Sequence, residues 1–238
     1  MQFESHTVET VERAGLVLED GGLIVTPSET NYSLVCDPEN AVAVAKVFEV
    51  KRRTKFGPLT LAIAEPSQAD RYVDYPPRYD RERLLSLWPG LVTLVLPKRY
   101  PFPTQLTMGA PTLGVLCHGD CALTDIVKAF GPVAVTSANL SGQGDIFVDR
   151  DKAAVDLGED VDLMIEAVTT TTDPLEIAGG VNRSNTIVDL TLDRPYLVRP
   201  GRVPVAEVMT ALPDLVTDPD RYREILERRL SQALEEVK

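Results

Sequence analysis

Apolar residues follow a helical spacing at the beginning of the chain and then switch to short continuous runs. Residues 7–20 carry apolar side chains among acidic ones, and Gly21-Gly22 ends this pattern, which predicts an amphipathic helix. The run Leu23–Val25 has the length and apolar character of a buried strand. Asp37-Pro38 then predicts the start of a second helix over Glu39–Val50, with the aspartate as N-cap and the proline in the first turn.

Seven further apolar runs have the length of strands, and several are separated by helical patterns. They are Leu59–Ala64, Leu91–Leu96, Thr112–Cys117, Val133–Thr136, Leu163–Ile165, Thr186–Leu190 and Tyr196–Val198. Strand and helix patterns in this mixture predict a mixed α/β fold.

The same pattern indicates one large domain followed by a helical tail. We assign the domain to residues 1–205 and the tail to residues 206–238. Helices are predicted around the start of the tail and near its end, over Val205–Leu212 and Pro219–Val237. Leucines recur at every fourth residue of the second helix, at 226, 230 and 234, so we expect this helix to pack against the domain.

Composition limits the classes of function that this chain can have. The 238 residues are 44% hydrophobic and 25% charged, which is ordinary for a globular protein. The formal net charge is −12, which excludes a broad basic surface for nucleic acid because phosphate neutralisation requires many lysines and arginines. Any contact with RNA would therefore be weak and confined to a local patch.

The cysteines and the N-terminus favour a cytoplasmic protein. Cys36, Cys117 and Cys121 are odd in number and widely spaced, which does not suggest a disulfide framework. No run of about 18 apolar residues occurs, and the first residues lack the pattern of a signal peptide. We therefore expect neither secretion nor membrane insertion.

Several catalytic classes have little support in the motifs. Histidine occurs only at His6 and His118, and no Gly-x-Ser-x-Gly elbow accompanies them, which disfavours a serine triad. Cys117-His118-x-x-Cys121 resembles part of a zinc site, but the zinc spacing is incomplete, so two structural cysteines are favoured and no metal ligand is predicted. The phosphate-loop and Gly-x-Gly-x-x-Gly motifs are absent from the sequence.

Hydroxyl and amide side chains follow predicted strands at two places. Residues 27–32 contain Ser28, Thr30 and Tyr32 directly after one strand, and Ser137 and Asn139 follow another. Loops at the carboxyl ends of strands often bind ligands in α/β folds. Alternatively, these polar side chains satisfy their own backbone in a turn.

Cations accompany these loops at two further positions. Lys51 and Arg53 follow the predicted second helix, and Arg199 closes the part of the chain that is rich in strands. If the chain is extended after the helix, residues 51 and 53 point the same way and form a clamp for phosphate. The alternatives are a favourable interaction with the helix dipole for the first two and a salt bridge for Arg199.

Seven segments, taken in order, give a more specific signal than any one of them. They are Pro27–Asp37, Lys51-x-Arg53, Pro58-Leu59, Trp88–Val95, Thr136–Gly142, Asn185–Asp189 and Arg199–Gly201. Together they resemble the YrdC-like family over about residues 8–205. The resemblance implies a twisted mixed sheet with flanking helices and a central, concave, positively lined cleft.

The resemblance also implies a reaction. Members of the family include threonylcarbamoyladenylate synthases, which combine ATP, L-threonine and bicarbonate into an acyl (carbamoyl) adenylate for tRNA modification and release pyrophosphate. Mg²⁺ is implied as the counter-ion of the ATP phosphates, held mainly through ATP and water.

Ten residues match the motifs that carry this function. The predicted catalytic residues are Lys51, Arg53 and Ser137. The predicted substrate-binding residues are Ser28, Thr30, Tyr32, Thr60, Asn139, Asn185 and Arg199. The three cations would hold ATP phosphates, residues 137 and 139 would hold nucleotide or carbamate oxygens, and residues 28–32 would line the threonine and bicarbonate side.

The chain departs from the family pattern at positions that concern charge. Leu116 replaces the arginine of Gly-Val-Arg-x-Pro, and Gly57 replaces the lysine that usually precedes Pro-Leu. Ser28, Ser33 and Asn185 replace Thr, Gly and Ser. Three functions follow as hypotheses: the synthase itself, a relative that acts on another amine or carbamoyl substrate, and a noncatalytic module that binds nucleotide or RNA.

Overall fold

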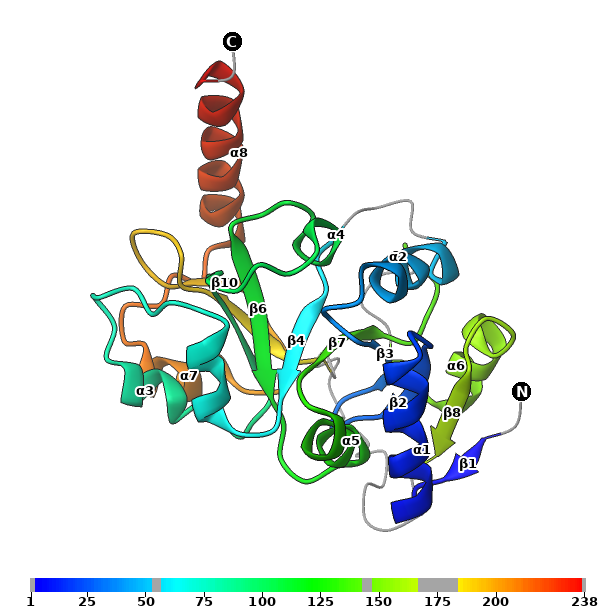
Figure 1. The fold of residues 1–238 in the computed structure, drawn as a ribbon. Helices are drawn as coiled ribbons and strands as arrows, with labels where there is room; N and C mark the ends of the chain where they lie inside the picture. The colour runs from blue at the N-terminus through cyan, green and yellow to red at the C-terminus, as the bar shows by residue number, and fades with distance from the viewer. Residues whose placement is uncertain (1–2, 53–56, 143–146, 167–183, 237–238) are drawn as a thin grey trace.

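The computed structural model describes residues 3–52, 57–142, 147–166 and 184–236, with side chains described up to residue 228, and ten strands within these ranges form one mixed sheet (Figure 1). The strands are β1 (Glu4–Ser5), β2 (Ile24–Pro27), β3 (Tyr32–Cys36), β4 (Thr60–Ile63), β5 (Val92–Pro97), β6 (Thr112–Cys117), β7 (Val133–Ser137), β8 (Leu163–Glu166), β9 (Thr186–Asp189) and β10 (Tyr196–Arg199). Their order across the sheet is β1-β8-β2-β3-β7-β4-β6-β5-β9-β10, with both parallel and antiparallel neighbours.

Helices flank this sheet. They are α1 (Val8–Glu19), α2 (Ala41–Val50), α3 (Arg81–Leu85), α4 (Thr104–Thr107), α5 (Ala122–Phe130), α6 (Arg150–Leu157), α7 (Val205–Ala211) and α8 (Pro219–Glu236), with a 3₁₀ helix over Pro66–Arg71. The predicted mixed α/β fold is therefore confirmed, and each of the predicted strands overlaps an observed one.

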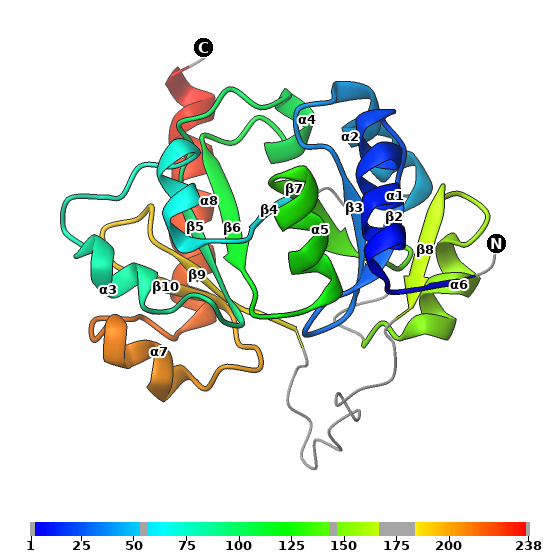
Figure 2. The ribbon, with the colours of Figure 1, turned by 60° about the horizontal axis from the view of Figure 1, so that its bottom comes forward.

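Alternating side chains divide the core between the two faces of the sheet. Val35 on β3 and Val135 on β7 pack in one buried cluster with residues of α1 and α5, which lie side by side in Figure 2. Their strand neighbours Leu34 and Ala134 pack in the larger cluster that contains residues of α2 and α4. Because side chains alternate along a strand, this division follows from the period of two.

Two local predictions were wrong. The second helix begins at Ala41, because the side chain of Asn40 accepts hydrogen bonds from the N–H groups of residues 42 and 43. Asp37, the predicted N-cap, instead accepts from the N–H of Glu39 at 2.8 Å in the preceding turn. Strand β3 was also missed, because residues 28–31 form the turn of a β2–β3 hairpin whose polar residues obscure the strand that follows.

The tail contacts the domain through aromatic and apolar residues at the start of α8. Tyr222 packs against Tyr196 of β10, with Ile225 beside the same cluster. The Tyr222 hydroxyl donates to Asp189 at 3.1 Å. Leu226, which was expected to be packed, is 38% exposed, and α8 projects away from the sheet in Figure 1. The side chains of residues 230 and 234 lie outside the described residues.

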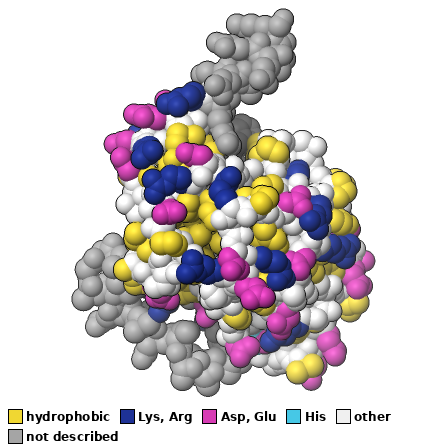
Figure 3. Space-filling model, turned by 90° about the vertical axis from the view of Figure 1, so that its left-hand side faces the viewer, with side chains coloured by type: hydrophobic (Ala, Val, Ile, Leu, Met, Phe, Trp, Pro, Cys, Tyr) yellow, Lys and Arg dark blue, Asp and Glu magenta, His cyan; other side chains and the backbone are white. Residues whose placement is uncertain are grey.

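Opposite charges are interspersed on the face that Figure 3 presents, which is the left-hand side of the molecule in Figure 1. Arg81 pairs with Asp70 at 2.6 Å, and the guanidinium of Arg99 pairs with Asp74. Such pairs leave few cations for a phosphate backbone.

No helix in the described part of the chain combines the length and the apolar character that crossing a bilayer requires.

Gly201 allows β10 to close against the beginning of β9. A Cβ atom at this position would lie 2.3 Å from the nitrogen of Thr186 and 2.4 Å from the carbonyl oxygen of Ser184. These neighbours are backbone atoms, which cannot move without displacing the strand. We therefore expect Gly201→Ala to lower the free energy of unfolding by about 1–3 kcal/mol in urea titrations.

Gly15→Ala is the matched control for this substitution. Gly15 lies inside α1, and a Cβ there would meet nothing within 4 Å, so the alanine should raise the free energy of unfolding by about 0.5–1 kcal/mol. Equal stabilities for the two variants would contradict the close approach at Gly201.

Candidate functional site

A row of side chains crosses seven neighbouring strands on one face of the sheet. The pairs opposite each other in the ladder are Ser33–Ser137, Val135–Thr60, Leu116–Thr93 and Ile187–Arg199. Residues two apart on a strand share a face, so Ser33 and Ser137 lie on the face where Val35 and Val135 pack near α1 and α5. The hydroxyls of Ser33 and Ser137 therefore lie on the same face as the apolar cluster, but they line a pocket.

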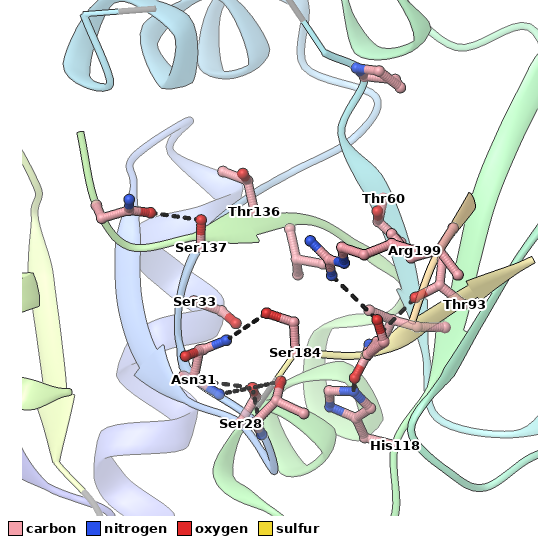
Figure 4. Close-up of a pocket in the computed structure, with 17 residues that line it drawn as sticks. Ser28, Asn31, Ser33, Thr60, Thr93, His118, Thr136, Ser137, Ser184 and Arg199 are labelled. Atoms are coloured by element: carbon pink, nitrogen blue, oxygen red, sulfur yellow. Dashed lines mark hydrogen bonds between the residues drawn. The ribbon is translucent and has the colours of Figure 1, made fainter. Parts of the chain in front are cut away.

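The pocket has a volume of about 290 Å³ and combines this row with residues from loops. Figure 4 shows hydroxyl, amide and imidazole side chains converging on it from both sides, together with the Arg199 guanidinium. Ser28, Thr30, Asn31 and Ser184 complete the polar wall. Arg199 is the one lysine or arginine that the described residues place on this wall. The positively lined cleft stays a prediction, because residues 53–56 lie outside the described residues.

Lys51 supports one side of the pocket without lining it. It follows α2 directly, is only 3% exposed, and its ammonium donates to the carbonyl oxygens of Ser137 and Asn139 at 2.5 and 2.7 Å. The Ser137 hydroxyl in turn donates to the Asn139 side chain at 2.6 Å. The ammonium therefore fixes the turn that carries the two predicted oxygen-binding residues.

The loop between β2 and β3 forms the opposite side. The Ser28 hydroxyl donates to the carbonyl oxygen of Asn31 at 2.7 Å, as in a turn that satisfies its own backbone. Asn31 links this loop to two other segments, because its side chain accepts from the N–H of Val148 at 2.9 Å and donates to the Ser184 hydroxyl at 3.5 Å. Ser28 thus satisfies the turn while also lining the pocket.

Asn185 connects the imidazole and the guanidinium of the site. Its side-chain amide lies 3.1 Å from Nε2 of His118 and donates to the Thr93 hydroxyl at 3.3 Å. Its main-chain carbonyl oxygen accepts from Nη2 of Arg199 at 3.2 Å. One residue at the start of β9 thereby orders a neutral group and a cation on the same wall.

His118 is uncharged at neutral pH in this environment. The side chain is 3% exposed, and burial lowers its pKa, although the nearby Glu29 carboxylate and the hydrogen bond to Asn185 act in the opposite direction. The Glu29 carboxylate itself accepts from the N–H of Gly119 at 2.7 Å. Nδ1 of His118 is buried and has no hydrogen-bond partner among the described residues.

Most of the predicted site residues converge. The seven that line the pocket are Ser28, Thr30, Thr60, Ser137, Asn139, Asn185 and Arg199. Lys51 lies behind the wall, and Tyr32 packs edge-on against the ring of Phe3 at 6.0 Å. Arg53 lies outside the described residues, so the clamp predicted for residues 51 and 53 stays a prediction.

The ten predicted site residues leave out several polar residues that also line the pocket. Among them are Asn31, Ser33, Thr93, His118 and Ser184. The available signal was a hydroxyl within an otherwise apolar strand, as at Thr93, and a polar residue directly after a strand, as at His118. Neither signal specifies a site until the register of the sheet is known.

The histidine, cysteine and acidic side chains do not gather into a metal centre in the described ranges, where no group of three or more is close enough to hold an ion. Cys121 contacts the Thr124 hydroxyl at 3.3 Å, and burial raises the pKa of the Cys117 thiol to about 11. Within the described part of the chain, these side chains therefore form no site of their own for Mg²⁺.

The fold is thus a mixed α/β sheet with a polar pocket on one face, and comparisons with known proteins give its family. A family model described as telomere recombination, which groups Sua5, YciO and YrdC sequences, matches residues 16–201. The chain belongs to this Sua5/YciO/YrdC family, as the sequence resemblance indicated.

Relatives and solved structures agree with this assignment. A threonylcarbamoyl-AMP synthase from Pyrococcus abyssi is 32% identical over 213 residues, covering 88% of this chain and 58% of the relative. The crystal structure of P. abyssi Sua5 complexed with L-threonine superposes with a TM-score of 0.77 at 28% identity, covering 90% of this chain and 60% of that chain. Escherichia coli YciO shares the fold, with a TM-score of 0.70 at 22% identity and coverages of 84% and 92%.

The Lys51 ammonium should contribute strongly to stability. Lys51→Met would leave the carbonyl oxygens of Ser137 and Asn139 without their charged donor, so we expect the free energy of unfolding to fall by about 2–3 kcal/mol. Lys46→Met is the control, because the Lys46 ammonium donates one hydrogen bond of 3.2 Å to the carbonyl oxygen of Gly21. A loss at Lys51 no larger than at Lys46, measured by urea unfolding, would contradict this role.

His118 should make the protein less stable in acid. Its pKa is lowered in the folded state, so below the ordinary value of about 6.5 the unfolded chain binds the extra proton first. The free energy of unfolding should therefore decrease as the pH falls from about 7 to 5, with a shallower decrease in His118→Gln. Identical slopes for wild type and His118→Gln would disprove the contribution of His118.

Proposed function

We propose that this protein is a threonylcarbamoyl-AMP synthase that joins ATP, bicarbonate and L-threonine and releases pyrophosphate. The observation that carries the proposal is the convergence of Ser137, Asn139 and Arg199 on one pocket, with Lys51 fixing the turn. The relatives named threonylcarbamoyl-AMP synthase, from Pyrococcus abyssi and Bacillus subtilis, support it. The chain spans 58% of the length of the P. abyssi relative. The activity of the whole relative is therefore not transferred to it, and the substrates and product are proposals for this chain.

The chemistry proceeds in two steps that suit a pocket of oriented donors. The threonine amine and bicarbonate form a carbamate with loss of water. A carbamate oxygen then attacks the α-phosphorus of ATP, the bond to the bridging oxygen of the β-phosphate breaks, and pyrophosphate leaves with the electron pair. Negative charge builds up at the α-phosphate, where preorganised donors lower the barrier most effectively.

Each wall of the pocket has a role in this proposal. Arg199 neutralises phosphate charge, and the Asn185 carbonyl oxygen holds its guanidinium in place. Ser137 is the proposed catalytic donor: its hydroxyl donates to the Asn139 side chain in the structure and would turn this proton to the substrate. Ser28, Thr30, Thr60 and Asn185 contact the remaining polar groups of the substrates. Lys51 acts on the turn, and Arg53 is assigned to the ATP phosphates on the resemblance alone.

Mg²⁺ enters this proposal only as the companion of ATP. The described residues supply no cluster of metal ligands, and Mg²⁺ commonly binds to nucleotide phosphates and water rather than to a protein cage. No step is assigned to it here.

A second candidate function is adenylation of a different amine. Leu116 faces the pocket where the family usually carries an arginine, and it is 6% exposed within an apolar cluster. An apolar group at this position favours a substrate with fewer negative charges. Pyrophosphate release measured with each of the amino acids would separate the candidates, since strict dependence on threonine would eliminate the second.

The proposed function has a direct test. Purified protein supplied with ATP, bicarbonate, L-threonine and Mg²⁺ should release pyrophosphate and form a product with the mass of threonylcarbamoyl-AMP. ATP binding without turnover on any amine would instead identify a noncatalytic nucleotide-binding module.

Ser137→Ala should reduce the rate of pyrophosphate release by about 10²-fold, because it removes a donor that acts in the transition state. Ser86→Ala is the matched control. The Ser86 hydroxyl is exposed, donates to the carbonyl oxygen of Arg83 and lies at the end of α3, so its loss should leave the rate unchanged. Equal rates for the two variants would remove Ser137 from the catalytic residues.

A further inference from the structure

His118 is the most deeply buried polar group of the pocket that the proposed chemistry leaves unused. It follows β6 directly, lines the pocket and is 3% exposed. A buried imidazole loses the hydration of its charged form, so burial favours the neutral ring, although the Glu29 carboxylate and the hydrogen bond to Asn185 act in the opposite direction. The hydrogen bonds of the ring indicate which neighbouring residues it holds in place.

The contacts of His118 lead to Arg199 in two steps. Nε2 lies 3.1 Å from the side-chain amide of Asn185, and the carbonyl oxygen of Asn185 accepts from Nη2 of Arg199 at 3.2 Å. Asn185 has little freedom to move independently, because its amide also donates to Thr93 and the N–H of the next residue donates to the carbonyl oxygen of Leu91 at 3.0 Å.

We propose that His118 is a positioning residue, which acts through Asn185 to hold the Arg199 guanidinium in the geometry that binds the anionic substrate. The proposal rests on the proposed function for the identity of that substrate, which is ATP. The ring itself does not touch the reacting atoms. Its effect is to keep in place the one cation that the described residues contribute to the wall.

Burial, rather than the nearest charge, keeps the ring neutral. Glu29 faces it from the β2–β3 loop, and Arg199 lies on the far side of Asn185. The Cys117 and Cys121 thiols beside it have raised pKa values and stay uncharged. A proton on the ring would place a second cation behind Arg199 and would leave an N–H at Nδ1 without a partner among the described residues.

The test compares ATP affinity in three variants by calorimetry. His118→Leu preserves bulk without a hydrogen bond, so we expect it to raise the Kd for ATP about tenfold. His118→Gln places an amide near Nε2, so it should return the Kd to within about threefold of wild type. His6→Gln is the matched control, because His6 lies near Asp125 at the molecular surface, and its Kd should equal that of wild type.

The pH dependence provides a readout that a merely structural role would not change. Because the terminal phosphate of ATP also titrates near pH 6, the quantity to follow is the Kd of wild type divided by the Kd of His118→Gln. This ratio should rise as the pH falls below about 6.5. A ratio that is constant with pH, or a His118→Leu variant with wild-type affinity, would overturn the proposal.

A double-mutant cycle shows whether the effect passes through Arg199. In an Arg199→Met background, His118→Leu should no longer weaken ATP binding, whereas additive losses would overturn the proposal. If wild type binds ATP without releasing pyrophosphate, the proposed function fails while the cycle still decides the role of His118. If wild type does not bind ATP, the same cycle is measured in the free energy of unfolding, where additivity would again overturn it.

Discussion

The register of the central sheet is the constraint on which the site depends. Ser33 pairs with Ser137 and Thr60 pairs with Val135, so polar residues on separate strands lie in one row. A shift of one residue in any strand would turn its member of the row to the opposite face, where the larger apolar cluster packs. The same alternation that forms two hydrophobic layers therefore also positions the floor of the pocket.

The pocket walls depend on groups that are ordered by neighbours rather than by solvent. Lys51 orders the Ser137–Asn139 turn, and Asn185 orders the guanidinium of Arg199. Both arrangements use charged donors on main-chain oxygens, which gives directional hydrogen bonds. Cations that are ordered in this way need little reorganisation when an anion binds. A chain with a net charge of −12 thereby keeps an ordered guanidinium at a polar pocket.

The sequence predicted the strands well because their apolar runs are short and bounded by turn residues. It predicted seven lining residues through the resemblance, since the order of the motifs was informative. It could not place Lys51 behind the wall, because the direction of a side chain at a helix end depends on tertiary contacts. Thr93 and Ser33 were missed because a hydroxyl in a strand gains meaning only from its partners across the ladder. The hairpin before β3 was hidden by its own polar turn.

The floor of the pocket is assembled from residues between positions 33 and 199, so no short stretch of the chain contains the site. Strands β3 and β10, at its two ends, become part of one surface only after the intervening pairs have formed. Contacts of such large sequence separation form late and cooperatively. A ligand of this pocket therefore binds only the fully formed sheet. Its binding energy adds to the stability of the whole domain rather than to any part of it.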